Sequence, residues 1–354
     1  MPASSPRPTS PSDEGMLRGS AEPRAYDVAG LGNALVDALV RMDDVEFLKA
    51  HGITRGHMTP VDHERWQAVF HEIQVHGVEI HSGGSCANTV ASLGFLGAKG
   101  IYCGNVGDDQ LGHLYARRME EACGEHALIW TREGNTGKCL SIISSVDAER
   151  TMLTDLGAAV HMHDLGRFRD IIPNSRLLHV TGYLMLGEPM RSRAHEAMAI
   201  AAQHELPISL DVADPFVVGV VKDEMWHAIE EFANIVFLNE EEARTLTGEA
   251  DPEAALARVA RVCDTVVVKL GRRGSLVQHR GRRAQVGVHA AQAIDTTGAG
   301  DSYAAGFLYG YLNGWSPARA ADLGARVAAM AVGQIGAVVR DRDRMRAAAV
   351  AAGA

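Results

Sequence analysis

The feature that most constrains the fold is a regular alternation of strand-like and helix-like segments after residue 164. Apolar runs typical of strands are RLLHVTGYLML, PISLDVAD, NIVFLN and DTVVVKLG, and between them lie the helical patterns PMRSRAHEAMAIAAQHE, DEMWHAIEEF and EEEARTLTG. Strands separated by helices of this length predict an α/β fold whose mainly parallel central sheet is flanked by helices. Ligands bind beyond the carboxyl ends of the strands in such sheets, so functional residues are expected just after strands.

The rest of the chain divides around this core. YDVAGLGNALVDALV reads as the first core strand and its turn, and KCLSIISSV followed by ERTMLTDL predicts a β-hairpin. We expect a main domain over residues 25–340, with a small β-lid built from segments of about 38–60 and 136–157. AGDSYAAGFLYGYLNG and SPARAADLGARVAAMAVGQ predict two long helices, and residues 341–354 are expected to be a tail. Residues 1–24 are rich in Pro and Ser, lack the apolar stretch of a secretory signal, and are expected to be a disordered leader.

Composition excludes several classes of function. The formal net charge is -10, whereas nucleic-acid binding requires a basic surface that replaces counterions. No apolar run is long enough to span a membrane. The five cysteines form no CxxC pair, and this odd, scattered set favours a cytoplasmic protein over a disulfide framework. The expected partners are therefore small molecules, and the sequence leaves open whether the chain is a monomer or a homodimer.

The strongest motif is the segment DTTGAGD, Asp295 to Asp301, directly before a predicted helix. Two glycines permit a sharp turn, which leaves the first amides of the helix without helical partners, and the helix dipole adds partial positive charge there. We predict that the amides of Ala299, Gly300 and Asp301 form an anion-binding nest that suits a phosphate in transfer. Asp301 lies beside this nest, where its carboxylate can accept a proton from an attacking hydroxyl.

Two further motifs offer groups that suit a polyhydroxy ligand. In GGSCAN, Gly84 and Ser85 begin a helix where a ligand can approach the backbone, and Asn88 offers both a donor and an acceptor. In GLGNALVD, Asn33 and Asp37 follow the first strand. A dinucleotide fingerprint would have Gly or Ala in place of Leu35, so a Rossmann dehydrogenase is disfavoured.

Two more motifs follow later strands. Asn239 and Glu242 come from NEEE after NIVFL, either as an ordinary helix start or as groups that reach a Mg²⁺–phosphate unit, with Glu242 contacting Mg²⁺ mostly through water. Lys269, Gly271 and Gly274 belong to KLGRRG, which fits a turn against a nucleotide or a hairpin. Neither a Walker A string nor an HRD catalytic loop occurs in the sequence.

Together these motifs resemble the ribokinase family of carbohydrate kinases, also called the PfkB family. The similarity runs from about Tyr26 to Val339 and is carried by GGSCANTVASLGFLGAKGIYCGNVGDDQLG and DTTGAGDSYAAGFLYG, in the family's order and separation. Within the family, GLGNALVD and AERTMLTDLG look most like the adenosine-kinase branch. The resemblance implies a ribokinase-like sheet flanked by helices, with a small β-lid over the acceptor site.

The resemblance also implies roles for residues. Asp301 would be the base, and Gly298, Ala299 and Gly300 would form the anion hole that binds the moving phosphoryl group. The residues expected to hold the acceptor are Asn33, Asp37, Gly84, Ser85, Asn88 and the lid residue Arg150, which this branch often uses to contact phosphate. The residues expected at ATP are Asn239, Glu242, Lys269, Gly271 and Gly274, with Lys269 standing where ribokinases often have Thr. A monovalent cation such as K⁺ near Asp295 would follow from family analogy alone.

The sequence therefore predicts an ATP-dependent and Mg²⁺-dependent kinase, a phosphotransferase that acts on the primary hydroxyl of a nucleoside or sugar. Adenine would need a flat apolar slot, for which Tyr183 and Phe216 are candidates, whereas Leu184 falls where an adenosine kinase could place a stacking Phe. A ribokinase, a fructokinase or another sugar kinase is the alternative. A non-catalytic sensor on the same fold is less favoured, because a sensor has no need of a base.

Overall fold

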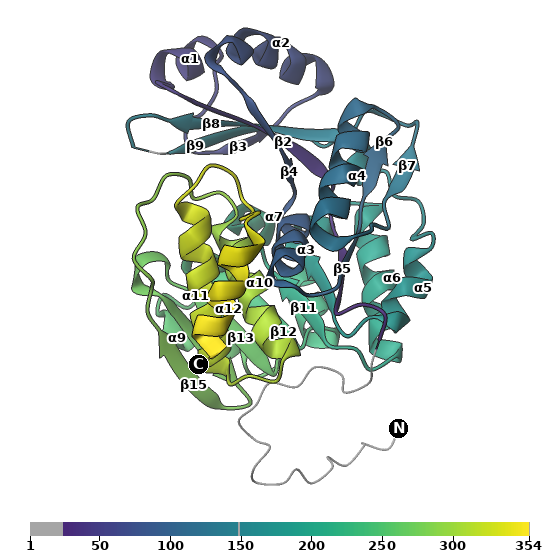
Figure 1. The fold of residues 1–354 in the computed structure, drawn as a ribbon, viewed down its shortest axis with the longest axis vertical. Coiled ribbons are helices and arrows are strands. Elements are labelled where there is room, and N and C mark those ends of the chain that lie inside the picture. The colour runs from purple at the N-terminus through teal and green to yellow at the C-terminus, as the bar shows by residue number, and fades with distance from the viewer. Residues whose placement is uncertain (1–23, 148, 354) are drawn as a thin grey trace.

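The computed structural model describes residues 24–147 and 149–353. Almost all of the predicted leader thus lies outside the described residues. The described chain forms a large mixed sheet covered by helices on both faces, with a smaller sheet lying above one end of it (Figure 1). No helix within the described ranges has both the length and the apolar character needed to cross a membrane.

The larger sheet has the strand order β15-β14-β13-β12-β11-β10-β1-β5, in which β14 runs antiparallel to its neighbours β13 and β15 and all the other pairs are parallel. Its strands are β1 (Val28–Leu31), β5 (Gly100–Cys103), β10 (Leu178–Thr181), β11 (Ile208–Asp211), β12 (Ile235–Asn239), β13 (Thr265–Lys269), β14 (Ser275–His279) and β15 (Arg282–Val286). The alternation of strands and helices correctly predicted the parallel part, because each helix returns the chain to the same end of the sheet.

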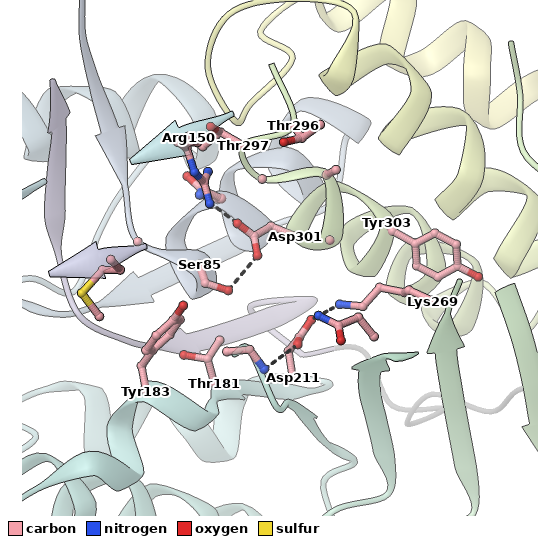
Figure 2. Close-up of a pocket in the computed structure, with 18 of the residues that line it drawn as sticks. Ser85, Arg150, Thr181, Tyr183, Asp211, Lys269, Thr296, Thr297, Asp301 and Tyr303 are labelled. Carbon is pink, nitrogen blue, oxygen red and sulfur yellow. Dashed lines mark hydrogen bonds and ion pairs between the residues drawn. The ribbon is translucent and has the colours of Figure 1, made fainter. Parts of the chain in front are cut away.

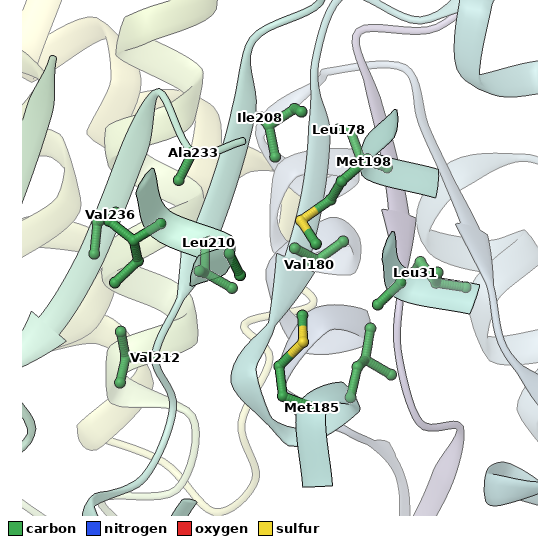
Figure 3. Packing of buried hydrophobic residues seen from close by; sticks show 14 of the residues in the cluster. Leu31, Leu178, Val180, Met185, Met198, Ile208, Leu210, Val212, Ala233 and Val236 are labelled. Atoms are coloured by element: carbon green, nitrogen blue, oxygen red, sulfur yellow. The ribbon is translucent and has the colours of Figure 1, made fainter. Parts of the chain in front are cut away.

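Two groups of helices cover the faces of this sheet. One face packs against α5 (Phe168–Ile171), α6 (Met190–Gln203), α7 (Pro215–Glu231), α8 (Glu240–Thr247) and α9 (Pro252–Val259). The other packs against α3 (Ser85–Leu96), α4 (Gln110–Cys123), α10 (Ala299–Leu312) and α11 (Pro317–Val332). The strands are consequently apolar on both sides, and Figure 3 shows Leu31, Val180 and Leu210 packed with Met185 and Met198 on the first face.

The smaller sheet has the order β3-β9-β8-β2-β4. Its strands are β2 (Leu35–Met42), β3 (Met58–Pro60), β4 (Glu79–Gly83), β8 (Gly137–Ser144) and β9 (Arg150–Asp155). Strands β8 and β9 form the expected antiparallel hairpin. Helices α1 (Val45–Ala50) and α2 (His63–Ile73) cover its outer face, where Trp66, Ile73, Leu140 and Leu153 are buried together.

Three segments differ from the sequence expectations. Strand β10 ends at Thr181, and Gly182–Leu186 turns into a short 3₁₀ helix. The segment that begins at Leu35 pairs with β4 and β8 in the smaller sheet, so it does not continue the first core strand. The predicted tail contains helix α12 (Arg342–Gly353), which packs with α3 and α11 through buried Met345.

A third, two-stranded sheet is formed by β6 (Asn105–Gly107) and β7 (Ile129–Thr131) and lies beside α4.

Candidate functional site

A cavity of about 1310 Å³ lies between the two sheets. It is lined by the carboxyl ends of central strands, the first turns of α3 and α10, and the inner face of the smaller sheet. A pocket for a single small ligand usually measures about 300–1,000 Å³, so a cavity of this size has room for two small ligands. All the site residues predicted from the sequence line it: Asn33, Asp37, Gly84, Ser85, Asn88, Arg150, Tyr183, Asn239, Glu242, Lys269, Gly271, Gly274, Gly298, Ala299, Gly300 and Asp301.

Asp301 lies in the middle of the cavity, in the first turn of α10 (Figure 2). Its Oδ1 accepts a hydrogen bond from Ser85 Oγ at 2.7 Å, and its Oδ2 accepts one from Asn88 Nδ2 at 2.9 Å. Burial raises the pKa of Asp301 above its usual value, while these two hydrogen bonds favour the ionised form and act against that rise. Helix α3 therefore fixes the orientation of a carboxylate that is poised to accept a proton. Both α3 residues, which the sequence analysis assigned to the acceptor, hold this carboxylate in the structure.

The turn before α10 provides the predicted nest, with one difference. Gly298 has φ of 67°, a left-handed conformation that suits glycine, and its carbonyl accepts from the Ser302 amide at 2.8 Å. The Ala299 amide donates to the Thr296 carbonyl at 3.3 Å. Within the described chain, the amides of Gly300 and Asp301 have no hydrogen-bond partner. Two free amides and the positive end of α10 therefore point at one place beside the Asp301 carboxylate.

The buried side chain of Asp295 holds the turn before α10 in place. Its carboxylate is 2% exposed and accepts hydrogen bonds from the Thr297 amide at 2.8 Å, from the Thr297 hydroxyl, and from the Gly336 amide at 3.0 Å. These bonds tie the loop before α10 to the loop after α11. The nest is thus held by the fold before any ligand binds.

One end of the cavity carries polar groups suited to vicinal hydroxyls. Asp37 lies on β2, and its burial raises its pKa to about 7, although the nearby Arg150 charge acts in the opposite direction. Asn33 precedes β2, and its buried Oδ1 has no hydrogen-bond partner among the described residues. The Arg150 guanidinium, at the start of β9, likewise donates no hydrogen bond within the described chain. These groups remain available to a ligand.

The walls of the same end are mostly apolar. Phe216 lines the cavity from the start of α7 and is 56% exposed, while the Tyr183 hydroxyl donates to Asp214 Oδ2 at 3.4 Å. Leu184 is fully buried in the core and does not line the cavity. The other apolar side chains here come from the smaller sheet, from the segment after β9 and from the segment that leads into α6: Leu35, Met58, Pro60, Met152, Leu156, Val160, Leu186 and Met190. This end of the cavity therefore offers apolar surface to a ligand.

The opposite end lies over the last parallel strands. Asn239 caps α8 by a capping box, in which its side chain accepts from the Glu242 amide at 2.8 Å and Glu242 Oε2 accepts from the Asn239 amide at 2.7 Å. Burial raises the pKa of Glu242 above its usual range. Beyond them most of the lining residues are small or apolar, namely Gly271, Gly274, Val288, Ala290, Ala291, Ala293, Ala325, Ala328, Ala329 and Val332, and Arg272 and His289 are the polar residues among them.

Asp211, Glu188 and Arg272 are charged residues that line the cavity and were not predicted from the sequence, and Asp211 lies deepest among them. Asp211 ends β11, is 3% exposed, and accepts from Lys269 Nζ at 2.9 Å through Oδ2. The signal that could have found it is its place at the carboxyl end of a predicted strand, in PISLDVAD. No cluster of three or more His, Cys, Asp or Glu side chains that could hold a metal occurs within residues 24–147 and 149–353.

Comparisons with known proteins identify relatives of this chain in sequence and in overall fold. The family described as pfkB family carbohydrate kinase matches residues 57–342. The guanosine-inosine kinase of Escherichia coli strain K12 is 26% identical over 265 residues, which cover 71% of this chain but only 59% of that protein. The adenosine kinase structure from Sinorhizobium meliloti superimposes with a TM-score of 0.83 at 34% identity, covering 92% of this chain and 99% of that one. A probable sugar kinase from Rhizobium etli CFN 42 gives a TM-score of 0.85 at 31% identity, covering 93% and 99% of the two chains.

Proposed function

The chain belongs to the pfkB family of carbohydrate kinases, and from that premise we propose that it transfers the γ-phosphoryl group of ATP to the primary hydroxyl of a nucleoside. The observation that carries this proposal is the juxtaposition of Asp301 with the free amides of Gly300 and Asp301 inside a cavity with room for two ligands. A carboxylate and an anion-binding nest at one point are what transfer of a phosphoryl group to a hydroxyl requires.

In the proposed mechanism the acceptor binds under the smaller sheet and ATP binds over β12 and β13. Asp301 takes the proton of the primary hydroxyl as the oxygen bonds to phosphorus, and ADP leaves as the bond to its bridging oxygen breaks. The amide nest binds the phosphoryl oxygens during the transfer. Catalysis on this view is mainly positioning and stabilisation of charge. The smaller sheet acts as a lid that excludes water from the transferring group.

The preference for a nucleoside over a free sugar rests on the walls of the acceptor end. Phe216, Met58 and Met152 present apolar surface that a purine would bury and a bare sugar would leave uncovered. The adenosine kinase and guanosine-inosine kinase relatives favour the same choice. A sugar kinase is the second candidate, supported by the polar pair Asn33 and Asp37 and by the probable sugar kinase relative.

The charged residues at the ATP end fit a Mg²⁺ ion held mainly by water and phosphate. Glu242 and Asp211 are 2% and 3% exposed and both line the cavity, so their carboxylates could bind water molecules of the Mg²⁺ shell. Bound Mg²⁺ would offset the negative charge of the phosphates. A monovalent cation near Asp295 is proposed by family analogy, and the proposed location of the enzyme is the cytoplasm.

The function is tested by ADP release from ATP with a panel of nucleosides and sugars, using wild type and Asp301→Asn. We expect ADP release that depends on a purine nucleoside, and a loss of roughly 10²–10⁴-fold in kcat in Asp301→Asn with ATP binding retained. Strong turnover with a sugar and none with nucleosides would favour the second candidate. Binding of nucleosides in thermal-shift measurements without any ADP release would refute the kinase function and support a sensor.

A further inference from the structure

Three neighbouring parallel strands end side by side on the floor of the cavity. Strand β11 ends in Asp211, β12 in Asn239 and β13 in Lys269, and Asn239 and Lys269 are paired in register. The Lys269 side chain reaches across β12 and places Nζ 2.9 Å from Asp211 Oδ2 (Figure 2). This ion pair lies where the phosphates of a nucleotide over β12 and β13 must pass to reach Asp301.

The Lys269 ammonium also lies beside the anion-binding nest. A Cβ atom built on Gly300 would be 3.1 Å from Lys269 Nζ. The ammonium is therefore next to the first turn of α10, where the amides of Gly300 and Asp301 are free. A cation and two unpaired amides thus converge on the place where the phosphoryl group is proposed to move.

The two members of the ion pair differ in access to the cavity. The side chain of Asp211 is 4% exposed, whereas that of Lys269 is 16% exposed. Burial disfavours a charged lysine, but the carboxylates of Asp211 and Glu242 outweigh that effect and raise the pKa of Lys269 above its usual value. Lys269 therefore remains an ammonium at neutral pH, and it is the partner that can turn toward a ligand. Its charge also favours the ionised form of Asp301.

We propose that Lys269 is a catalytic residue of the phosphoryl transfer, whose ammonium donates hydrogen bonds to the phosphoryl oxygens while Asp211 holds its side chain in place. This inference rests on the proposed kinase function. The oxygen of the acceptor hydroxyl bonds to phosphorus, its proton passes to Asp301, and the bond to the bridging oxygen of ADP breaks. Lys269 gives up no proton in this step. It offsets the negative charge that shifts between the phosphoryl group and ADP.

A structural ion pair is the competing explanation, and variants separate the two. Lys269→Met removes the charge at similar length, Lys269→Arg retains it, and Lys49→Met on the exposed surface of α1 is the matched control. We expect kcat to fall by about 10²–10³-fold in Lys269→Met, which is the effect of removing one donor from an anion hole, and to fall less in Lys269→Arg. Calorimetric binding should weaken more for ATP than for AMP in Lys269→Met, because AMP lacks the β- and γ-phosphates.

The double variant Lys269→Met/Asp211→Asn decides the matter even if Lys269→Met is unstable. If Lys269 serves only to neutralise Asp211, removal of both charges returns kcat to the value of Asp211→Asn alone, and the proposal is overturned. If Lys269 contacts the phosphoryl group, the double variant stays as slow as Lys269→Met. If the wild type is active and Lys269→Met has the same kinetic constants, the proposed role of Lys269 is also overturned. A wild type that phosphorylates no acceptor would instead overturn the proposed function.

Discussion

The substitution Gly298→Ala tests whether the turn before α10 is built for catalysis. Gly298 has φ of 67°, and a Cβ atom at this position would lie 2.8 Å from Ala337 Cα and closer still to Ala337 Cβ. The left-handed conformation costs alanine about 1–2 kcal/mol, and the overlap adds about 1–3 kcal/mol of overpacking strain. Part of this strain is relieved if the turn moves away from Ala337, which would displace the amides of Gly300 and Asp301.

Gly124→Ala is the matched control for this substitution. Gly124 ends α4 with φ of 87°, is exposed, and has no atom within 4 Å of a built Cβ. The substitution Gly124→Ala should lower the free energy of unfolding by about 1–2 kcal/mol and leave kcat unchanged. Gly298→Ala should lower that free energy by about 2–5 kcal/mol and reduce kcat by about 10²–10³-fold, as when an anion-hole donor is lost.

The assay combines denaturant unfolding with steady-state ADP release at saturating ATP and acceptor. Measurement well below the unfolding temperature of both variants separates loss of folded enzyme from loss of turnover. If the kcat of folded Gly298→Ala were within about twofold of the wild-type kcat, displacement of the Gly300 and Asp301 amides would have no effect on turnover. This result would contradict the expectation for an anion hole. The nest would then have no catalytic role.

Two other predictions concern pH. Because the Ser85 hydroxyl stabilises ionised Asp301, Ser85→Ala should raise the pKa of Asp301 further and move the acid limb of the kcat profile to higher pH, and an unmoved limb would contradict the base assignment. Asp37 has a pKa of about 7 in the folded protein and a lower one when unfolded, so the folded state binds more protons and stability falls as pH rises from about 4 to about 7. Asp37→Asn should therefore raise the free energy of unfolding at pH 8 by on the order of 4 kcal/mol at most, and with it the unfolding temperature, with the gain vanishing toward pH 4 while the KM for the acceptor rises. A lower unfolding temperature at pH 8 would contradict this.

Local pattern predicted much of the fold and of the site. The alternation of strands and helices indicated the parallel sheet, and the glycines before α10 indicated the nest, because both depend on residues close in sequence. The Asp295–Asp301 motif likewise placed a carboxylate beside the first turn of a helix. These features required no knowledge of distant contacts.

Features that depend on distant contacts could not be read from the sequence. Ser85 and Asp301 are 216 residues apart, so their hydrogen bond gives no local signal. The pairing of Leu35 with Gly83 moves β2 into the smaller sheet, although its apolar pattern suits the larger one equally well. The alanines of α11 that line the cavity at the end proposed for ATP resemble ordinary core residues of an amphipathic helix.

The most direct test of the account is to identify the product by ³¹P NMR after incubation of the wild type with MgATP and a purine nucleoside. We expect one phosphate ester on the 5′-hydroxyl for each ADP formed, and no ester when the 5′-deoxy analogue replaces the nucleoside. ADP accompanied by free phosphate, or an ester on a secondary hydroxyl, would contradict the placement of the acceptor against Asp301 and the nest.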